Sequence, residues 1–216
     1  MRKPGNVVWE FSEPPDLTVG SGATAAERLL VYATSSLAAL TYLVLWYFDV
    51  YPWAWWHYVV CAFFAFDIAG GAIANVTNAG KRFFHTAIKD GDPGVVRFFK
   101  SDVNFALLHV HTIVLALLIP DVSLFAGVAW YIGLLAGVLT VMSVPLYLQR
   151  PIAFLFIVLA IIVHRYFLPL GSGLEWVVPL IFIKIVYGHT VQEEPYRPPE
   201  GDGQPGAPQN AGGASG

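Results

Sequence analysis

The sequence predicts an all-α, polytopic membrane bundle of about six transmembrane helices, with the N-terminus and the C-terminus cytoplasmic. Three observations lead to this prediction. Of the 216 residues, 56% are hydrophobic and only 12% are charged, which is about half the charged fraction of a typical soluble domain. The apolar residues form long runs that are almost free of charge, and the basic residues lie between alternate runs.

The first apolar run follows a polar segment, residues 1–24, which we expect on the cytoplasmic side. Thr24 and Glu27 have the spacing of a capping box, in which each side chain bonds to the backbone amide of the other residue. Residues 29–48 then contain no charged residue. A run of this length crosses a hydrocarbon core of roughly 30 Å.

The second predicted span, residues 53–78, contains Asp67 and continues into a polar stretch that ends at His85. The connection over residues 86–102 is rich in turn residues. Within it, residues 95–100 alternate apolar and basic side chains and predict a short interfacial helix.

Four further spans complete the predicted transmembrane domain, residues 25–193, and they cover 103–119, 124–148, 152–167 and 174–191. We expect a tight turn at residues 149–151, between the fourth and fifth spans. Residues 194–216 are rich in Pro and Gly and have little to bury, so they are predicted to be disordered.

The basic residues predict the orientation. With the N-terminus inside, ten of the twelve Lys and Arg residues lie on the cytoplasmic side, as the positive-inside rule requires. These ten are Arg2, Lys3, Arg28, Lys81, Arg82, Lys89, Arg97, Lys100, Arg150 and Arg197. The predicted location is therefore the cell membrane, or the inner membrane of a bacterium.

Composition also limits the partners. A net charge of −3, with no basic run, argues against nucleic acid. The single cysteine, Cys61, excludes an internal disulfide. The expected partners are the lipid bilayer, an apolar or lipid substrate, and an oligomer or larger membrane complex.

One stripe of polar side chains is the main candidate for chemistry. On a continuous helix, five polar residues of the second span and its extension lie within about a quarter of the circumference. Ionisable groups inside a bilayer cost several kcal/mol unless they are paired or hydrated, so they are candidate functional residues. We predict catalytic roles for Asp67, Asn75, Asn78 and Arg82; the alternative is that they only bond to neighbouring helices.

Histidines at the same depth suggest a metal site. His85, His109 and His189 all lie near the cytoplasmic ends of predicted spans. Imidazole and carboxylate groups that converge from several helices are typical ligands of zinc or a transition metal, and they are equally typical of a proton relay. We predict these three histidines as metal ligands, and the identity of the cofactor stays open.

Two local alternatives stay open. His109 and His111 point to opposite faces of a regular helix, and we favour the face that His109 shares with Asp102. Lys184, within the sixth span, either pairs with Asp67 or extends toward the cytoplasmic surface.

The histidine spacing matches no family that we considered. Six-helix cytochromes of the ascorbate-reducible type need paired histidines on four central helices, and here residues 124–148 contain none. The HxxxH pair of alkaline ceramidases and the histidine boxes of fatty-acid desaturases are also absent.

Three functions are compatible with these features. The first is an enzyme, metal-dependent in one version, that acts on a lipid or apolar substrate near the cytoplasmic face. The second is a proton- or cation-coupled transporter centred on Asp67, although no internal repeat is visible. The third is a subunit or assembly factor of a larger membrane complex.

Overall fold

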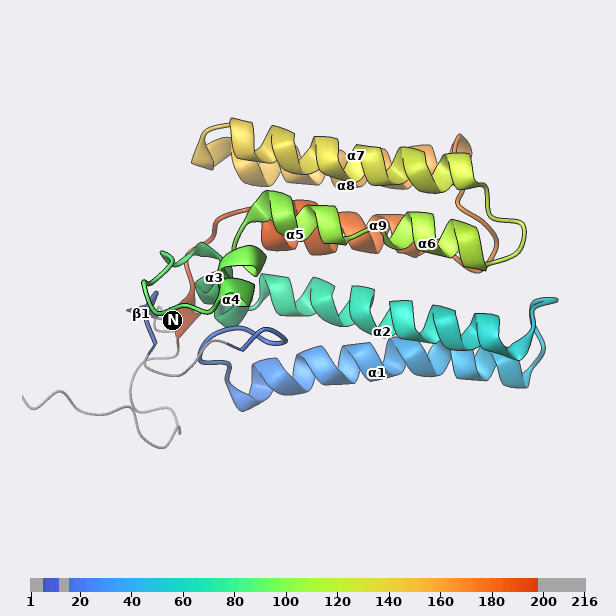
Figure 1. The fold of residues 1–216 in the computed structure, drawn as a ribbon, viewed down its shortest axis with the longest axis horizontal. Coiled ribbons are helices and arrows are strands. Elements are labelled where there is room, and N and C mark those ends of the chain that lie inside the picture. The colour runs from blue at the N-terminus through green and yellow to red at the C-terminus, as the bar shows by residue number, and fades with distance from the viewer. Residues whose placement is uncertain (1–5, 12–15, 198–216) are drawn as a thin grey trace, which may run out of the picture.

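A computed structural model describes residues 6–11 and 16–197 of the chain. The long helices run side by side along the longest dimension of the molecule and form three layers (Figure 1). Helices α1 and α2 form one outer layer, and α7 and α8 form the other. The middle layer contains α5 and α6 together with α9 and the π-helix η1, and both α9 and η1 pack against α2 and α8.

Four helices are long and apolar enough to cross a membrane. They are α1 (Ala25–Tyr47), α2 (Trp55–Val76), α7 (Leu124–Ser143) and α8 (Leu146–Tyr166). Two shorter apolar helical stretches, Asp102–Leu118 and Val177–His189, lie between them. The prediction of a helical bundle suited to a membrane is therefore confirmed.

The first helix begins as its sequence predicts. Thr24 is the N-cap of α1, and its hydroxyl accepts from the backbone amide of Glu27 at 3.2 Å. The Glu27 carboxylate accepts in return from the Thr24 amide at 2.8 Å. This reciprocal pair satisfies two amides that a helix start leaves without a partner.

The second span does not continue as one helix into the polar stretch. It ends at Val76, because Thr77 adopts an extended conformation, and α3 (Asn78–His85) begins afresh. The Thr77 hydroxyl caps α3 by accepting from the amide of Gly80 at 3.0 Å. The prediction of an uninterrupted polar stripe from Asp67 to His85 is therefore wrong.

The third predicted span, residues 103–119, is also broken, into α5 (Asp102–Leu108) and α6 (His111–Leu118). In a regular helix the Phe105 carbonyl would accept from the backbone amide of His109. Here Nδ1 of the His109 imidazole lies 2.6 Å from the Phe105 carbonyl oxygen. The backbone amide of His109 donates to the carbonyl of Ala106 instead. At the break, the His109 side chain thus competes with its own backbone amide for the Phe105 carbonyl.

The turn between α7 and α8 lies earlier than predicted. It is formed by Val144 and Pro145, and residues 149–151 lie inside α8. The residue before a proline favours an extended conformation, and Val144 adopts one. The expected turn at residues 149–151 is therefore wrong.

The remaining elements are short. A short helix is present where the interfacial helix was predicted, as α4 (Gly94–Phe99). The predicted sixth span consists of α9 (Val177–Phe182) followed by η1 (Ile183–His189). Strands β1 (Asn6–Val7) and β2 (Tyr196–Arg197) pair in antiparallel fashion. Strand β2 lies within residues 194–216, which the sequence predicts to be disordered. Residues 198–216 lie outside the part of the chain that the structure describes.

Candidate functional site

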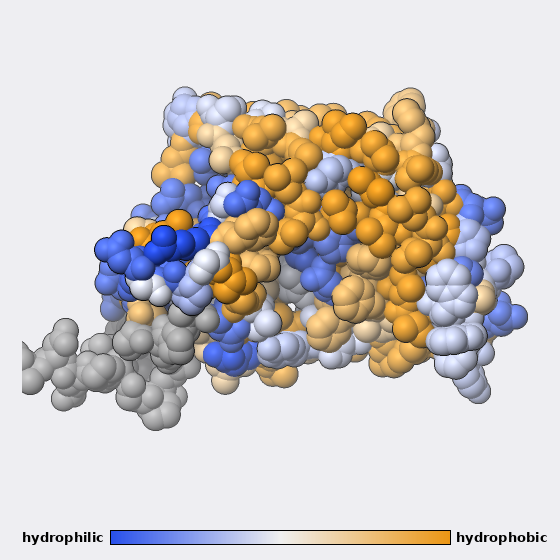
Figure 2. All heavy atoms as spheres, viewed as in Figure 1, coloured by the Kyte–Doolittle hydropathy of each residue, from blue (hydrophilic) through white to orange (hydrophobic). Residues whose placement is uncertain are grey.

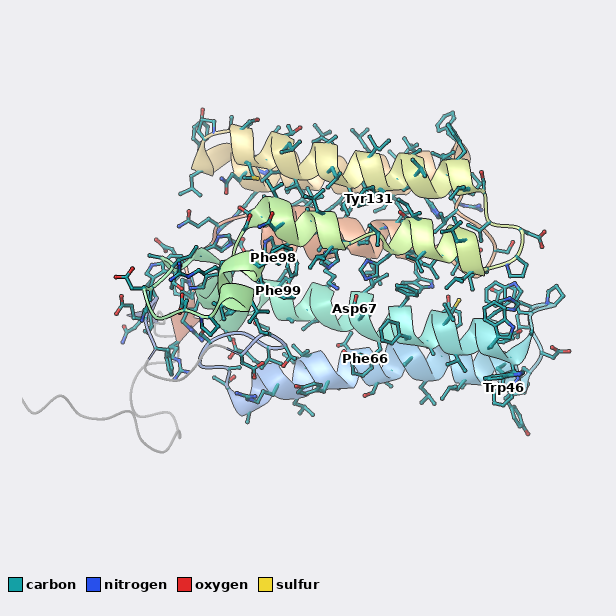
Figure 3. All side chains as sticks on the ribbon, viewed as in Figure 1. Trp46, Phe66, Asp67, Phe98, Phe99 and Tyr131 are labelled. Atoms are coloured by element: carbon teal, nitrogen blue, oxygen red, sulfur yellow. The ribbon has the colours of Figure 1, made fainter. Side chains whose placement is uncertain are left out.

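The centre of the site is the carboxylate of Asp67, about halfway along α2 (Figure 3). One oxygen, Oδ2, accepts from the Lys184 ammonium at 2.7 Å and lies 2.8 Å from Nε2 of His111. The Lys184 side chain is 4% exposed and that of His111 is 13% exposed. Of the two possibilities for Lys184, the structure therefore shows the pair with Asp67.

The face of α2 that follows Asp67, toward Val76, packs against η1. Gly71 leaves the space that Lys184 occupies, because a Cβ at residue 71 would overlap the lysine side chain. One turn further, the side-chain amide of Asn75 donates to the carbonyl of Lys184 at 2.9 Å. Asp67, Gly71 and Asn75 thus share one face of α2, as predicted, and this face contacts the π-helix.

Both histidines of the broken third span face the interior. The rings of His109 and His111 stack with centroids 5.0 Å apart and an interplanar angle of 22°. The prediction that they point to opposite faces is wrong, because the helix is interrupted between them. His111 was not among the predicted site residues, although it is an ionisable residue within a predicted span, because the face of His109 was favoured.

The arrangement around His111 suits acid–base chemistry. A carboxylate on Nε2 favours the tautomer that carries hydrogen on this nitrogen, so Nδ1 has a free lone pair. Nδ1 is buried and has no hydrogen-bond partner among the described residues. An imidazole held in this way by a carboxylate could act as a base whose positive charge the carboxylate would balance.

The carboxylate is open on one side. The Asp67 side chain is 42% exposed, although its lysine partner is buried. Figure 2 shows hydrophilic side chains within an otherwise apolar lateral face, between the layer of α2 and that of α5 and α6. On the same helix, Phe63 and Phe66 are exposed to 67% and 43%.

A second polar cluster lies at the end of the bundle near α3. His189, fully buried, has Nε2 3.1 Å from Oδ1 of Asp102. Its ring lies between Phe105, stacked at 4.0 Å, and Phe84, edge-on at 4.2 Å. His85 lies beside this pair, and burial together with the nearby Lys81 ammonium lowers the pKa of His85 to about 4.

The three predicted metal ligands are divided between the two clusters. His85 and His189 belong to the second cluster, whereas His109 contacts His111. The ring of Phe105 contacts both His109 and His189, with centroids 4.6 and 4.0 Å away. Within residues 6–11 and 16–197, no group of three or more His, Cys, Asp or Glu residues could hold a metal ion. The structure therefore does not show the predicted zinc or transition-metal site.

Asn78 and Arg82 contact the terminal segments and not the Asp67 cluster. The Asn78 side-chain oxygen accepts from the amide of Tyr196 at 2.7 Å. The fully buried Arg82 guanidinium donates to the carbonyls of Ser21 and Gly22 at 2.9 and 3.2 Å. These contacts, made possible by the new direction of α3, fasten both terminal segments to the bundle.

Lys81 is a further buried cation that the sequence prediction did not single out. Its ammonium donates at 2.7 Å to the carbonyls of Gly188 and Val191 and lies 3.7 Å from a carboxylate oxygen of Glu193. Burial lowers its pKa to about 8. Lys81 therefore satisfies carbonyls at the end of η1 that the helix leaves open.

Comparison with protein-family models, with curated proteins and with solved structures finds no match to this chain.

Proposed function

We propose that this chain is a six-span protein of the cell membrane with both termini in the cytoplasm. Support comes from the basic residues, of which ten of twelve fall on one side under this orientation. The stretch Asp102–Leu118 is about 26 Å long at 1.5 Å per residue. It lies alongside the longer helices, as does Val177–His189, so both count as spans in this proposal (Figure 1).

Its function is acid–base catalysis on an apolar or lipid substrate. The observation that carries this proposal is the Asp67 carboxylate, which binds both His111 and Lys184 and yet is 42% exposed on an apolar lateral face. A carboxylate in contact with hydrocarbon alone costs several kcal/mol. A polar group of a substrate that enters from the bilayer would cover it.

The roles of the residues follow from their bonds. His111 takes a proton at Nδ1 once the substrate reaches this buried nitrogen, and Asp67 stabilises the resulting imidazolium through Nε2. Lys184 keeps Asp67 ionised and the resting site close to neutral. Asn75 positions Lys184 through its backbone carbonyl.

The depth of the site limits the substrate. Asp67 lies nine residues from the end of α2, or about 14 Å along the helix axis. Moving a strongly charged headgroup out of water to this depth would require a large desolvation free energy. The substrate class that fits is an apolar molecule whose reactive group is uncharged, such as a hydroxyl or carbonyl.

The test uses purified full-length protein in liposomes made from the total lipid extract of the source cells. Mass spectrometry of the lipids should reveal a species that is converted by the wild-type protein and not by Asp67→Asn or His111→Gln. His164→Gln is the matched control, because His164 is also a buried histidine but its Nε2 accepts from the amide of Leu170. Conversion that persists in both site variants, or no conversion at all, overturns the proposal.

A second candidate is proton-coupled transport, favoured by the interrupted helices beside Asp67. The break between α5 and α6 and the π-helix η1 both lie next to the site. Such irregular segments are common at ion and substrate sites of transporters. Proteoliposomes with a trapped pH indicator would show proton movement that depends on Asp67, and movement unchanged in Asp67→Asn excludes this candidate.

A further inference from the structure

Two polar clusters contact the same aromatic ring, that of Phe105. The first contains Asp67, Lys184, His111 and His109, and the second contains His189, Asp102 and His85. Phe105 contacts both clusters, because its ring centroid lies 4.6 Å from that of His109 and its ring stacks on His189 at 4.0 Å with an interplanar angle of 13°. Phe105 is 6% exposed.

A phenyl ring at this place interrupts proton transfer. Protons move between groups that donate and accept hydrogen bonds, and a phenyl ring offers neither a donor nor a strong acceptor. On one side, Nδ1 of His109 is held by the Phe105 carbonyl at 2.6 Å. On the other side, Nε2 of His189 faces Asp102 at 3.1 Å. The two imidazoles are therefore separated as long as the ring stays in place.

The backbone around Phe105 can rearrange more easily than a regular helix. The break at His109 and Val110 follows Phe105 within one turn, and the π-helix ends at His189 on the facing segment. Irregular helix segments have fewer regular backbone bonds to break when a side chain moves. Displacement of the ring, which also contacts Phe84 and Phe99, is the movement that the inference requires.

The opposite direction offers no comparable polar route. Beyond Asp67, toward the Trp55 end of α2, the buried side chains of this helix are Ala65, Cys61, Tyr58 and His57, and the two nearest to Asp67 are apolar. The Tyr58 hydroxyl bonds to the backbone of Tyr51. The described polar groups therefore connect the Asp67 cluster with the α3 end of the bundle.

We propose that Phe105 is a gate that separates the acid–base centre from the His189–Asp102–His85 cluster and, when displaced, lets the two exchange protons. This inference rests on the proposed function, since it assigns the cytoplasmic side as the destination of the proton that His111 removes. The proton passes from His111 to His109, whose stacked rings lie 5.0 Å apart and must turn to form a hydrogen bond. It then passes to His189 and Asp102 and leaves beside His85. One proton enters the route and one leaves it, so each residue returns to its initial state.

The charges along this route differ between the two sides of the gate. His109 faces Asp67, Lys184 and His111. His189 faces Asp102, with the ammonium groups of Lys81 and Lys184 also acting on it. His85 faces Lys81, Asp102 and His189. Asp102 is thus the anion that offsets the lysines where the proton arrives after passing Phe105.

The test is hydrogen exchange of the imidazole N–H groups in the full-length protein, labelled with 15N-histidine and placed in lipid nanodiscs. After transfer to D2O, the N–H signals of His109 and His111 should decay slowly in the wild type. Phe105→Ala should accelerate their decay about tenfold or more, because opening no longer moves a buried phenyl ring. Phe105→Val, which also lacks the ring, serves as a second opening variant if the alanine variant does not fold.

Phe99→Ala is the matched control, because its ring also contacts Phe105, at 5.7 Å, but has no ring contact with either histidine. It should leave the exchange rate unchanged, and Asp102→Asn should slow exchange in the Phe105→Ala background. Equal rates in the wild type and both opening variants, or equal acceleration by Phe99→Ala, overturn the gate. Lipid conversion by the wild type and by His111→Gln reports separately on the proposed function. Equal conversion by these two proteins overturns that function, even if the exchange rate depends on Phe105.

Discussion

Asp67 and Lys184 are separated by 117 residues in the chain, and their side chains meet at 2.7 Å between α2 and η1. The pair is asymmetric, because the lysine side chain is 4% exposed and the aspartate side chain is 42% exposed. An uncompensated buried charge is costly, and Asp67 also contacts His111, whereas Lys184 has no second carboxylate partner among the described residues. The two partners therefore depend on each other to different degrees.

This asymmetry predicts the outcome of a double-mutant cycle. Asp67→Asn leaves the buried ammonium without its anion and should destabilise the protein by about 3 kcal/mol. Lys184→Met leaves a carboxylate that still contacts His111, so it should cost less. The double variant should be less destabilised than the sum of the two by about 1–3 kcal/mol. Unfolding in mixed detergent micelles measures all three, and additive effects would contradict the pairing.

A second prediction tests the space reserved for Lys184. Gly71→Ala places a methyl group where the lysine side chain lies, so the flexible lysine should move away from Asp67 while the fold persists. Lipid conversion should fall strongly, by about tenfold if about 1.4 kcal/mol of the interaction is lost. Gly133→Ala is the control, because the nearest atom to its new methyl group would be 3.7 Å away. Equal activity of the two variants would refute the role of Gly71.

The third prediction concerns acid stability and His85. The pKa of His85 is about 4 in the folded protein, against an ordinary value of 6.5. Between these values the unfolded chain binds a proton at His85 and the folded protein does not, so stability falls as pH falls from about 6.5 to about 4. His85→Phe should lose less stability over this window than the wild type. Detergent unfolding at pH 6.5 and pH 4.5 gives the difference, and identical losses would contradict the prediction.

A fourth prediction concerns the terminal segments. Arg82→Lys removes the planar group that donates to the carbonyls of Ser21 and Gly22, and lysine cannot reproduce both bonds from one position. Loss of about 1–2 kcal/mol in these bonds should raise cleavage of residues 16–24 by a protease roughly 5- to 30-fold. Arg97→Lys is the matched control, since Arg97 also donates to loop carbonyls, those of Asp90 and Asp92. Unchanged cleavage in Arg82→Lys would show that the two bonds from Arg82 contribute little to the stability of this segment.

Features that depend on neighbours in the chain were predictable. The capping box at Thr24 and Glu27 and the short helix near residues 95–100 follow from a few consecutive residues, and both are present. The apolar runs similarly predict the long helices, because their length alone suits a hydrocarbon core. Asp67 could be singled out for the same reason, as an isolated carboxylate within such a run.

What only the tertiary structure decided is where the helices break and which side chains meet. The break at Thr77 divides the predicted polar stripe, so that Asn75 serves the Asp67 cluster while Arg82 binds the terminal segment. The break at His109 brings two histidines together that a regular helix would separate. Both breaks reflect competition for a few backbone bonds, and the partner of Lys184 lies on a helix more than one hundred residues away. Local sequence patterns do not show which of the competing bonds will form. The free energy of each bond depends on groups that only the folded chain brings into contact.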